Sequence, residues 1–539
     1  MKADCIVVSL VLLCGGQGVW AAQSESHHHT EPTEKLGTVS FPVSCAASSQ
    51  APFERGVALL HSFWYDAAEK QFKEIADKDP ACAMAYWGEA MSFYHQLWDR
   101  PDKEYLRRGW ELVHKAEATG QKTDRERGYI EALASFYRDY EQVDHEKRAT
   151  AYSQSMERVY KRYPDDHEAA VFYALSLLAS EPEGDTELAY PKKAVSILDE
   201  VLKKEPDHPG VAHYLIHACD NPKMAYLGLP AARRYAAIAP AAPHALHMPS
   251  HIFTRLGLWQ EDIQSNLASK AAAEKLYGSG AQNRLHAMDF LEYAYLQTGQ
   301  DDKAKAIIAE SETVRAEDLD QGFRGYLNYA HAHLPAMYVL ETRSWKDAEA
   351  LEPPSGAGAD HQAITYWAQA VGAGHLHDVA AARRAVQRYE ATIEAVKQSS
   401  YAYAAKGMNT NRDEARAWLA FAEGKNEEAL GLLRPIAERQ AQGGKGEVEL
   451  PAREMLADML LEMNRSQDAL REYKRSLQSD PNRFNGLYGA AHAAELAHDN
   501  EKASVYSAQL LKNCEGAAKS DRPELAHAKE LATQARVSK

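Results

Sequence analysis

The sequence predicts an all-α protein built as a solenoid of repeated helix pairs. The chain has 539 residues, which is too long for a single compact core. Alanine-rich stretches with a period near 3.6 residues are frequent, whereas alternating β-branched runs are nearly absent. Small, apolar and proline residues also recur at fixed offsets: Ala68, Phe72 and Pro80; Ala194, Leu198, Val201 and Pro206; Ala469, Tyr473, Ser476 and Pro481.

These offsets resemble the second half of a tetratricopeptide (TPR) repeat, which has small or apolar positions followed by a proline. The resemblance covers most of residues 51–515. It implies a TPR-type α-solenoid, a right-handed superhelix of about ten to twelve helix pairs. The chain also resembles a group of uncharacterised exported bacterial TPR proteins, through Phe41–Cys45, Leu60–Tyr65 and the segments around His213 and His247. That resemblance implies the fold and export, and no activity.

The N-terminus has the features of a cleaved signal peptide over residues 1–22. Lys2 provides a positive charge, Cys5–Cys14 is an apolar run, and the small residues Ala21 and Ala22 offer a cleavage site. The apolar run is too short to span a bilayer. We therefore expect a periplasmic or secreted protein with no integral membrane segment in the mature chain.

The mature chain is expected to divide into four parts. They are an extended N-terminal arm (23–50), an N-terminal and central TPR-like solenoid (51–320), degenerate TPR-like helical repeats (321–440) and C-terminal TPR repeats (441–539).

The overall charge argues against nucleic acid as a partner. Asp and Glu outnumber Lys and Arg by 77 to 61, which gives a formal net charge of −16. A phosphate backbone would be repelled by that field. The TPR resemblance instead implies a protein, a peptide or a small ligand bound in the concave groove.

Four cysteines follow the expected cleavage site: Cys45, Cys82, Cys219 and Cys514. Export permits disulfides, and four cysteines allow three full pairings between which the sequence does not choose. We favour a Cys45–Cys82 disulfide that ties the N-terminal arm to the first helix pair. The alternative is four buried free thiols.

The strongest functional signal is a histidine array at the repeat spacing. His213 and His217 form one H-x-x-x-H motif, and His247 and His251 form a second one, 34 residues later (247 − 213). Residues at i and i+4 share a helix face, and neighbouring helices lie roughly 8–10 Å apart. In TPR numbering these histidines occupy positions 5 and 9 of successive repeats, which face the groove in that family. We therefore expect the four imidazoles to converge.

Further groove residues extend this array. His244 and His286 both occupy position 2, and Asp289 takes position 5 of the following repeat. Asp220 and Tyr293 are expected as outer partners of the ligands. The predicted metal ligands are His213, His217, His244, His247, His251, His286 and Asp289. This number of ligands could fill one metal site or two adjacent ones.

Imidazole is a common ligand of zinc, copper and iron, so the array predicts a transition-metal site of unspecified identity. Groove histidines that contact a peptide or small ligand, or that have a purely structural role, are the two alternatives. Pro249 lies between His247 and His251 and should kink the helix or delay its start.

The sequence assigns no catalytic residue, because it contains no H-E-x-x-H motif, nucleophile elbow or P-loop. Three functions stay open. The first is an exported TPR solenoid that binds a transition metal as part of ligand or partner binding. The second is a metal-dependent enzyme, an oxidoreductase or hydrolase, that uses the same histidines. The third is a metal-free scaffold for protein–protein interaction.

Overall fold

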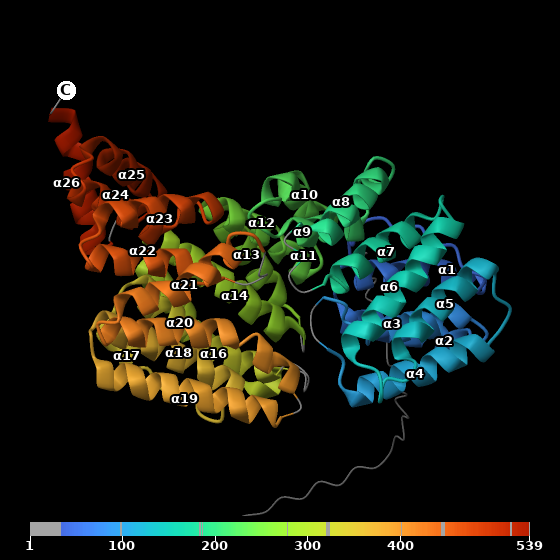
Figure 1. Cartoon of the computed structure of the whole chain (residues 1–539). Helices are drawn as coiled ribbons and strands as arrows, with labels where there is room; N and C mark the ends of the chain where they lie inside the picture. Colours follow the sequence, from blue (N-terminus) through green and yellow to red (C-terminus); the bar gives the residue numbers. More distant parts are fainter. Residues whose placement is uncertain are drawn as a thin grey trace, which may run out of the picture. The chain divides into compact units, whose positions relative to one another are not determined.

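The computed structural model describes residues 34–97, 100–182, 185, 187–276, 279–319, 324–399, 401–443, 448–517 and 520–537. These residues form helices and irregular segments, with no strand among them (Figure 1). The chain divides into two units, Met1–Glu34 and Lys35–Lys539, and the second unit carries every helix of the described residues. The expected signal peptide and the first part of the arm lie outside the described residues.

Successive helices pack as antiparallel pairs joined by short turns, so the predicted all-α solenoid is confirmed. The described residues contain twelve such pairs, if α11 and α12 count as one interrupted helix, followed by α26. The helices are α1 (Gln50–His61), α2 (Tyr65–Lys78), α3 (Ala83–Met91), α4 (Lys103–Ala118), α5 (Asp124–Tyr137), α6 (His145–Arg162), α7 (His167–Ala179), α8 (Ala189–Leu202), α9 (Pro209–Cys219), α10 (Ala225–Ile238), α11 (Pro243–His247), α12 (Pro249–Leu256), α13 (Trp259–Ala273), α14 (Ser279–Gln297), α15 (Asp301–Ser311), α16 (Arg324–Glu341), α17 (Trp345–Glu349), α18 (Ala359–His375), α19 (Val379–Lys397), α20 (Asn409–Ala422), α21 (Asn426–Gln440), α22 (Ala452–Glu462), α23 (Ser466–Ser479), α24 (Phe484–Leu496), α25 (Asn500–Asn513) and α26 (Pro523–Val537).

Contacts between an aromatic ring and a glycine explain the recurring offsets at both ends of the chain. The ring of Phe72 in α2 lies so close to Gly88 in α3 that a Cβ there would meet it at 2.3 Å. Tyr473 in α23 and Gly489 in α24 repeat this contact, with the same closest distance of 2.3 Å. The sequence offset is also the same, from 72 to 88 and from 473 to 489. Each pair therefore approaches the next through the same close contact.

Prolines set the starts of the histidine-bearing helices. Pro209, Pro243 and Pro249 lie in the first turns of α9, α11 and α12, where the missing N–H would have no partner within the helix. The disturbance predicted at Pro249 takes the form of a break, since α11 ends at His247 and α12 begins at Pro249.

Within the predicted arm (23–50), residues 35–46 have no helix and pack on the helices around them, whereas Ala47–Ser49 form a 3-10 helix and α1 begins at Gln50. Phe41 is fully buried, and the Thr38 amide donates to the Asp207 carbonyl at 3.0 Å. A disulfide joins Cys45 of the arm to Cys82, which precedes α3. The arm is thereby attached both to the first repeats and to the start of α9. The other two cysteines, Cys219 and Cys514, are buried free thiols.

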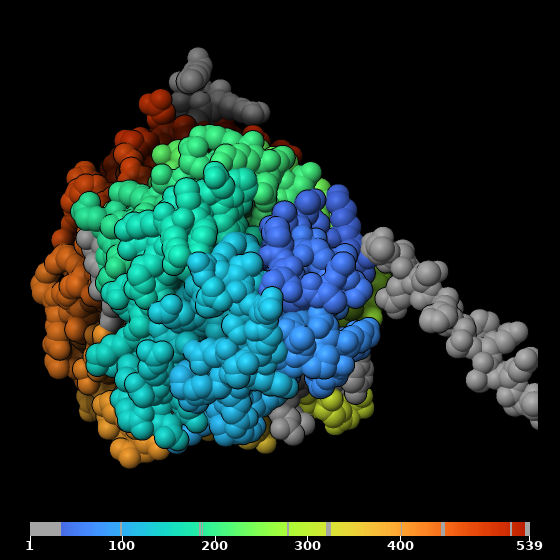
Figure 2. Space-filling view, turned by 90° about the vertical axis from the view of Figure 1, so that its right-hand side faces the viewer, coloured from blue at the N-terminus to red at the C-terminus, as the bar shows by residue number. Residues whose placement is uncertain are grey.

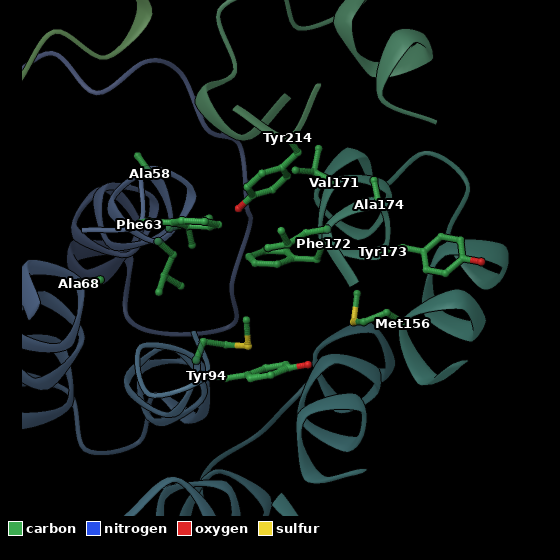
Figure 3. Packing of buried hydrophobic residues seen from close by; sticks show 14 of the residues in the cluster. Ala58, Phe63, Ala68, Tyr94, Met156, Val171, Phe172, Tyr173, Ala174 and Tyr214 are labelled. Atoms are coloured by element: carbon green, nitrogen blue, oxygen red, sulfur yellow. The ribbon is translucent and has the colours of Figure 1, made fainter. Parts of the chain in front are cut away.

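Two large hydrophobic clusters fill the interior. One runs from Leu36 to Phe253 and the other from Trp259 to Ala503, so the division falls between α12 and α13. Figure 2 looks onto the surface that the N-terminal helices form over the first cluster. Inside it, Phe63, Phe172 and Tyr214 come from three separate segments and turn toward one another (Figure 3). No helix in the described ranges is long and apolar enough to cross a membrane.

A buried arginine connects helices that are far apart in the sequence. Arg483, just before α24, donates to Glu454 of α22 and to Glu341 of α16, both at 2.7 Å, and also to Tyr293 of α14. All three partners are buried, and Asn485 donates to Glu341 as well. The guanidinium therefore neutralises two carboxylates that water does not reach.

Replacing Arg483 with methionine should destabilise the protein by about 3–5 kcal/mol, because Glu341 and Glu454 would remain buried without their cation. Arg416→Met is the matched control, since its pair with Glu390 is exposed and worth at most about 1 kcal/mol. Urea unfolding of the two variants measures the difference. Equal losses in both would contradict the role given to Arg483.

Candidate functional site: a buried histidine cluster

The structure brings together six of the seven predicted metal ligands. His213 and His217 lie on α9, His244 and His247 on α11, His251 on α12 and His286 on α14. They form two groups of three, in each of which one ligand atom per residue lies within 4.8 Å of the others. We call His213, His217 and His244 group A, and His247, His251 and His286 group B.

Short distances between ring nitrogens define both groups. In group A the Nε2 atom of His213 lies 3.1 Å from Nε2 of His217 and 3.1 Å from Nε2 of His244. In group B the Nε2 atoms of His247 and His251 are 3.0 Å apart. The ring of His286 completes group B, with its centroid 4.2 Å from that of His247.

The six histidines form two adjacent groups rather than one, and two adjacent sites were one of the two arrangements that the sequence left open. Each motif forms its own group, and the third ring comes from position 2 of the next repeat: His244 for group A and His286 for group B. The groups nevertheless adjoin, because the rings of His244 and His247 are 6.1 Å apart and those of His217 and His251 are 6.3 Å apart. The cluster is also buried, whereas an open groove was expected, and only His217 of the six is partly exposed.

Two predicted residues lie elsewhere. Asp289 belongs to neither group, since it accepts a hydrogen bond from Nδ1 of His333 in α16 at 2.8 Å. Although Asp289 follows His286 by three residues on α14, its carboxylate is engaged by His333 of the next helix pair. Tyr293 follows His286 by two helical turns, about 10 Å along the axis. There its hydroxyl contacts Arg483 and the carbonyl of Glu449, and it is not an outer partner of the ligands.

Hydrogen bonds at Nδ1 orient four of the six rings, and in one of them Nδ1 of His286 lies 2.6 Å from the hydroxyl of Tyr326. Nδ1 of His213 donates to the carbonyl of His61 at 2.6 Å, and Nδ1 of His251 donates to Asp220 at 3.0 Å, which is the outer role predicted for Asp220. Nδ1 of His247 lies 2.7 Å from Oδ1 of Asn266. A neutral imidazole whose Nδ1 donates has its lone pair on Nε2, which is the atom that faces the cluster.

The other contacts of the Asn266 side chain show which of its two polar atoms faces His247. Its Nδ2 atom donates to the backbone carbonyl of Asp262 at 3.1 Å and to the side-chain Oδ1 of the same residue at 2.7 Å. The amide oxygen is therefore the atom that faces His247. Asp220 is held in a similar way, because Nε of Arg255 donates to its second oxygen at 2.7 Å.

A second buried hydrogen-bond network positions His61, whose carbonyl accepts the hydrogen bond from Nδ1 of His213. The side chain of His61, at the end of α1, donates from Nε2 to Glu168 at 2.8 Å, and His208 contacts the other oxygen of Glu168 at 2.9 Å. Although burial alone would raise it, the two imidazoles hold the pKa of Glu168 well below its usual range. Both oxygens of Glu168 accept a hydrogen bond from an imidazole. The network therefore holds His61, and with it the end of α1, in place.

One phenylalanine packs against each group. Phe63 contacts all three rings of group A, with centroid distances of 4.4 Å to His213 and 5.6 Å to His217 and His244. Phe290 does the same in group B, at 4.8 Å from His247, 4.7 Å from His251 and 5.5 Å from His286. Phe63 has a φ of 51°, which is unusual for a bulky residue and marks a conformation imposed by its surroundings.

Burial keeps these imidazoles neutral. It lowers the pKa of His213, His244 and His247 well below the ordinary value of 6.5, and it lowers the pKa of His217 and His286 to about 3. Neighbouring histidines lower these pKa values further, since like charges would repel. The rings therefore present lone pairs to one another in a space with little water.

The remaining histidine and cysteine groups are less suited to a metal. Cys45 and Cys82 lie near Asp79, but the disulfide between them removes both thiolates. Near the C-terminus, His492 and His527 share a single oxygen of Glu495, at 3.1 and 3.2 Å. All three of those residues are partly exposed, so they form an ordinary surface cluster.

Several residues of this site were missed in the sequence. Phe290 could have been found, because it follows His286 by four residues and so lies on the same helix face. The stretch Leu60–Tyr65 contributed to the family resemblance, but nothing in it indicated that His61 and Phe63 contact the cluster. The sequence did not indicate a role for Asn266, because its partner His247 belongs to another helix.

Comparisons with known proteins agree only on helical repeats. No protein-family model and no curated protein matches the chain. Similar solved structures include a monomeric IFIT1 mutant with Gppp-AAAA (12% identity, 89% of this chain and 95% of that chain, TM-score 0.35) and another with m7Gppp-AAAA (12%, 88% and 95%, 0.35). The TPR domain of P58(IPK) is also similar (13%, 91% and 99%, 0.20). At these values the similarity carries no argument about the site.

Replacing Asp262 with asparagine should remove one pH-dependent contribution to stability. Burial raises the pKa of Asp262 to about 8 from the ordinary 3.8, so between these values the folded state keeps a proton that the unfolded state has lost. The stabilisation is complete below pH 3.8 and is lost as the pH rises through 8. The free energy of unfolding of the wild type should thus fall relative to Asp262→Asn by about 1.4 kcal/mol per pH unit.

Urea unfolding of metal-free protein between about pH 5 and pH 7 measures this slope. Asp302→Asn, which alters an exposed carboxylate in the first turn of α15, is the control and should follow the wild type. Parallel curves for the wild type and Asp262→Asn would show that Asp262 is ionised in the folded protein.

Proposed function

We propose that this chain is an exported helical-repeat protein that binds transition-metal ions, one in each three-histidine group. The observation that supports this most directly is the pair His247 and His251. Both rings direct Nδ1 outward to an acceptor, so in their neutral forms both Nε2 atoms carry lone pairs that face each other at 3.0 Å. Such an arrangement is repulsive unless a cation lies between the lone pairs.

A metal ion accounts for more of the geometry than a proton does. Two imidazole nitrogens bound to one ion at 2.0–2.1 Å are separated by roughly 3 to 3.5 Å, which matches the distances in both groups. A shared proton would join two rings, whereas each group brings a third ring to the same place. The outward Nδ1 contacts are also the usual second layer around metal-bound histidines.

The ligand type supports zinc, copper or iron over magnesium and calcium. All six candidate ligands are imidazoles, which suit borderline transition metals, whereas Mg²⁺ and Ca²⁺ need several oxygens. Three protein ligands also leave a fourth position open for water or a ligand. This open position supports the second candidate function, a metal-dependent enzyme that uses the same cluster.

Burial argues against direct binding of a peptide by the histidines. Five of the six rings are buried, so a partner in the groove would meet other side chains. The helical array still offers extended surfaces to a protein or ligand, and the disulfide is compatible with the proposed export to an oxidising compartment.

Metal analysis of protein purified without an affinity tag tests the proposal. The wild type should bind about two ions per chain, and His213→Ala and His247→Ala should each bind about one, because each variant loses the central ring of one group. The double variant should bind none. His498→Asn, at an exposed residue with a φ of 61° that asparagine tolerates, is the control and should bind two.

Circular dichroism of the metal-free proteins checks that each variant is folded. A wild type that takes up no zinc, cobalt or copper when these are supplied, or a folded double variant that still takes up two ions, would refute the proposal.

Asn266→Ala should weaken metal binding in group B alone, by about 10- to 100-fold, because Asn266 orients the ring of His247 and touches no ring of group A. Titration of metal-free protein with cobalt should then show one site of unchanged affinity and one weakened site. Group A serves as the internal control, and two equally weakened sites would contradict this assignment.

A further inference from the structure

We infer that groups A and B together form one dinuclear copper centre, which binds dioxygen between its two ions when both are Cu(I). This inference rests on the metal-binding function proposed above and adds the identity of the metal and the class of ligand. Three features of the cluster support it: the equivalence of the two groups, their adjacency, and the charge of their surroundings.

The two groups are built from equivalent parts. Each consists of one H-x-x-x-H motif, one histidine from the next repeat and one phenylalanine that packs on all three rings. Two ions would therefore have nearly the same ligands, which gives them similar affinities and similar redox properties. The adjacent rings of the two groups, with centroids 6.1 and 6.3 Å apart, would place the two ions side by side in the buried cluster.

The charge of the surroundings favours monovalent ions. A metal-bound imidazole brings no negative charge, and Asp220, the carboxylate that contacts His251, is paired with Arg255. The other nearby carboxylate, Asp289, is held by His333. Two divalent ions would bring four positive charges into the buried cluster, whereas two Cu(I) ions bring two. Since the cost of burying charge rises steeply with its magnitude, the difference is large. Copper is the first-row metal that binds imidazole well in the monovalent state.

Binding of dioxygen conserves that charge. Each Cu(I) gives one electron to O₂, which becomes the peroxide dianion bridging two Cu(II) ions. New Cu–O bonds form, the O=O bond is reduced to a single bond, and no proton is taken up or released. The two ions and the bound oxygen together carry two positive charges before and after the step. Release of O₂ returns both electrons to copper, so binding alone needs no other reductant.

The cluster offers less support for zinc-dependent hydrolysis. That reaction needs a base that takes a proton from metal-bound water. Both oxygens of Asp220 already accept hydrogen bonds, from His251 and Arg255, and Asp289 is engaged by His333. Phe63 and Phe290 add an apolar surface over the rings, which suits a small apolar molecule. His217, the partly exposed ligand, marks the side nearest to solvent.

The test compares one protein sample in two metal forms. Metal-free protein is loaded without air with about two equivalents of Cu(I) or of Zn²⁺, and both forms are then exposed to air. We expect the copper form to take up one O₂ per two copper ions and to develop an intense near-ultraviolet charge-transfer band. It should give no electron paramagnetic resonance signal, because the two bridged Cu(II) spins pair. The zinc form should show none of these changes.

Single-site variants provide the matched controls. His213→Ala and His247→Ala should each bind one copper, lack the band and give an ordinary Cu(II) resonance signal in air. His498→Asn should behave as the wild type does. If the wild type binds two copper ions that give separate Cu(II) signals and no band, the dinuclear inference fails while the metal-binding function stands. If it binds zinc and excludes copper, the inference also fails. If no metal binds, both proposals fail.

Discussion

Hydrogen bonds to Nδ1 are the constraint on which the histidine cluster depends. An imidazole has two nitrogens, and the partner of one determines what the other presents. His213, His247 and His251 have Nδ1 engaged by a backbone carbonyl at the end of α1, an amide oxygen within α13 and a carboxylate at the end of α9. These acceptors are themselves fixed by Glu168, Asp262 and Arg255. Two further layers of buried polar contacts thus direct the Nε2 atoms toward the cluster. Burying so many polar groups would be costly if the rings only filled space.

Repetition of the helix pair explains why there are two histidine groups and why the following repeat does not form a third. Positions 5 and 9 of one repeat and position 2 of the next carry histidine twice in succession. In the following repeat, Asp289 and Tyr293 occupy the equivalents of His247 and His251, and each has turned to other partners: Asp289 to His333 and Tyr293 to Arg483. Hence the same backbone arrangement that creates a histidine group in two repeats creates ordinary buried hydrogen bonds in the third.

The sequence was sufficient for the fold and for the clustering of six histidines, because both depend on regular spacing. The offset from Phe72 to Gly88 and the i, i+4 histidine pairs are consequences of a helix and a repeat, and they can be counted. The division of the histidines into two groups could not be predicted from residue spacing. It depends on the break before Pro249, which sets His247 and His251 on two short helices, and on how far His244 and His286 extend from the neighbouring repeats. Asn266 and Phe63 contact the cluster only through tertiary structure, so no local sequence pattern indicated their role.

The position of the cluster links its chemistry to the stability of the array. In a solenoid each repeat contacts mainly its neighbours, so a division of the core is a place where the array can bend or separate. Here the core divides between α12 and α13, Phe63 belongs to the first hydrophobic cluster, and Phe290 belongs to the second. Group B itself crosses the division, since His247 and His251 precede it and His286 follows it on α14. An ion bound by these three rings would hold the two halves of the core together, and loss of the ion would leave mutually repelling lone pairs at the same place. On the proposed function, binding of a metal would therefore also make the central repeats more rigid.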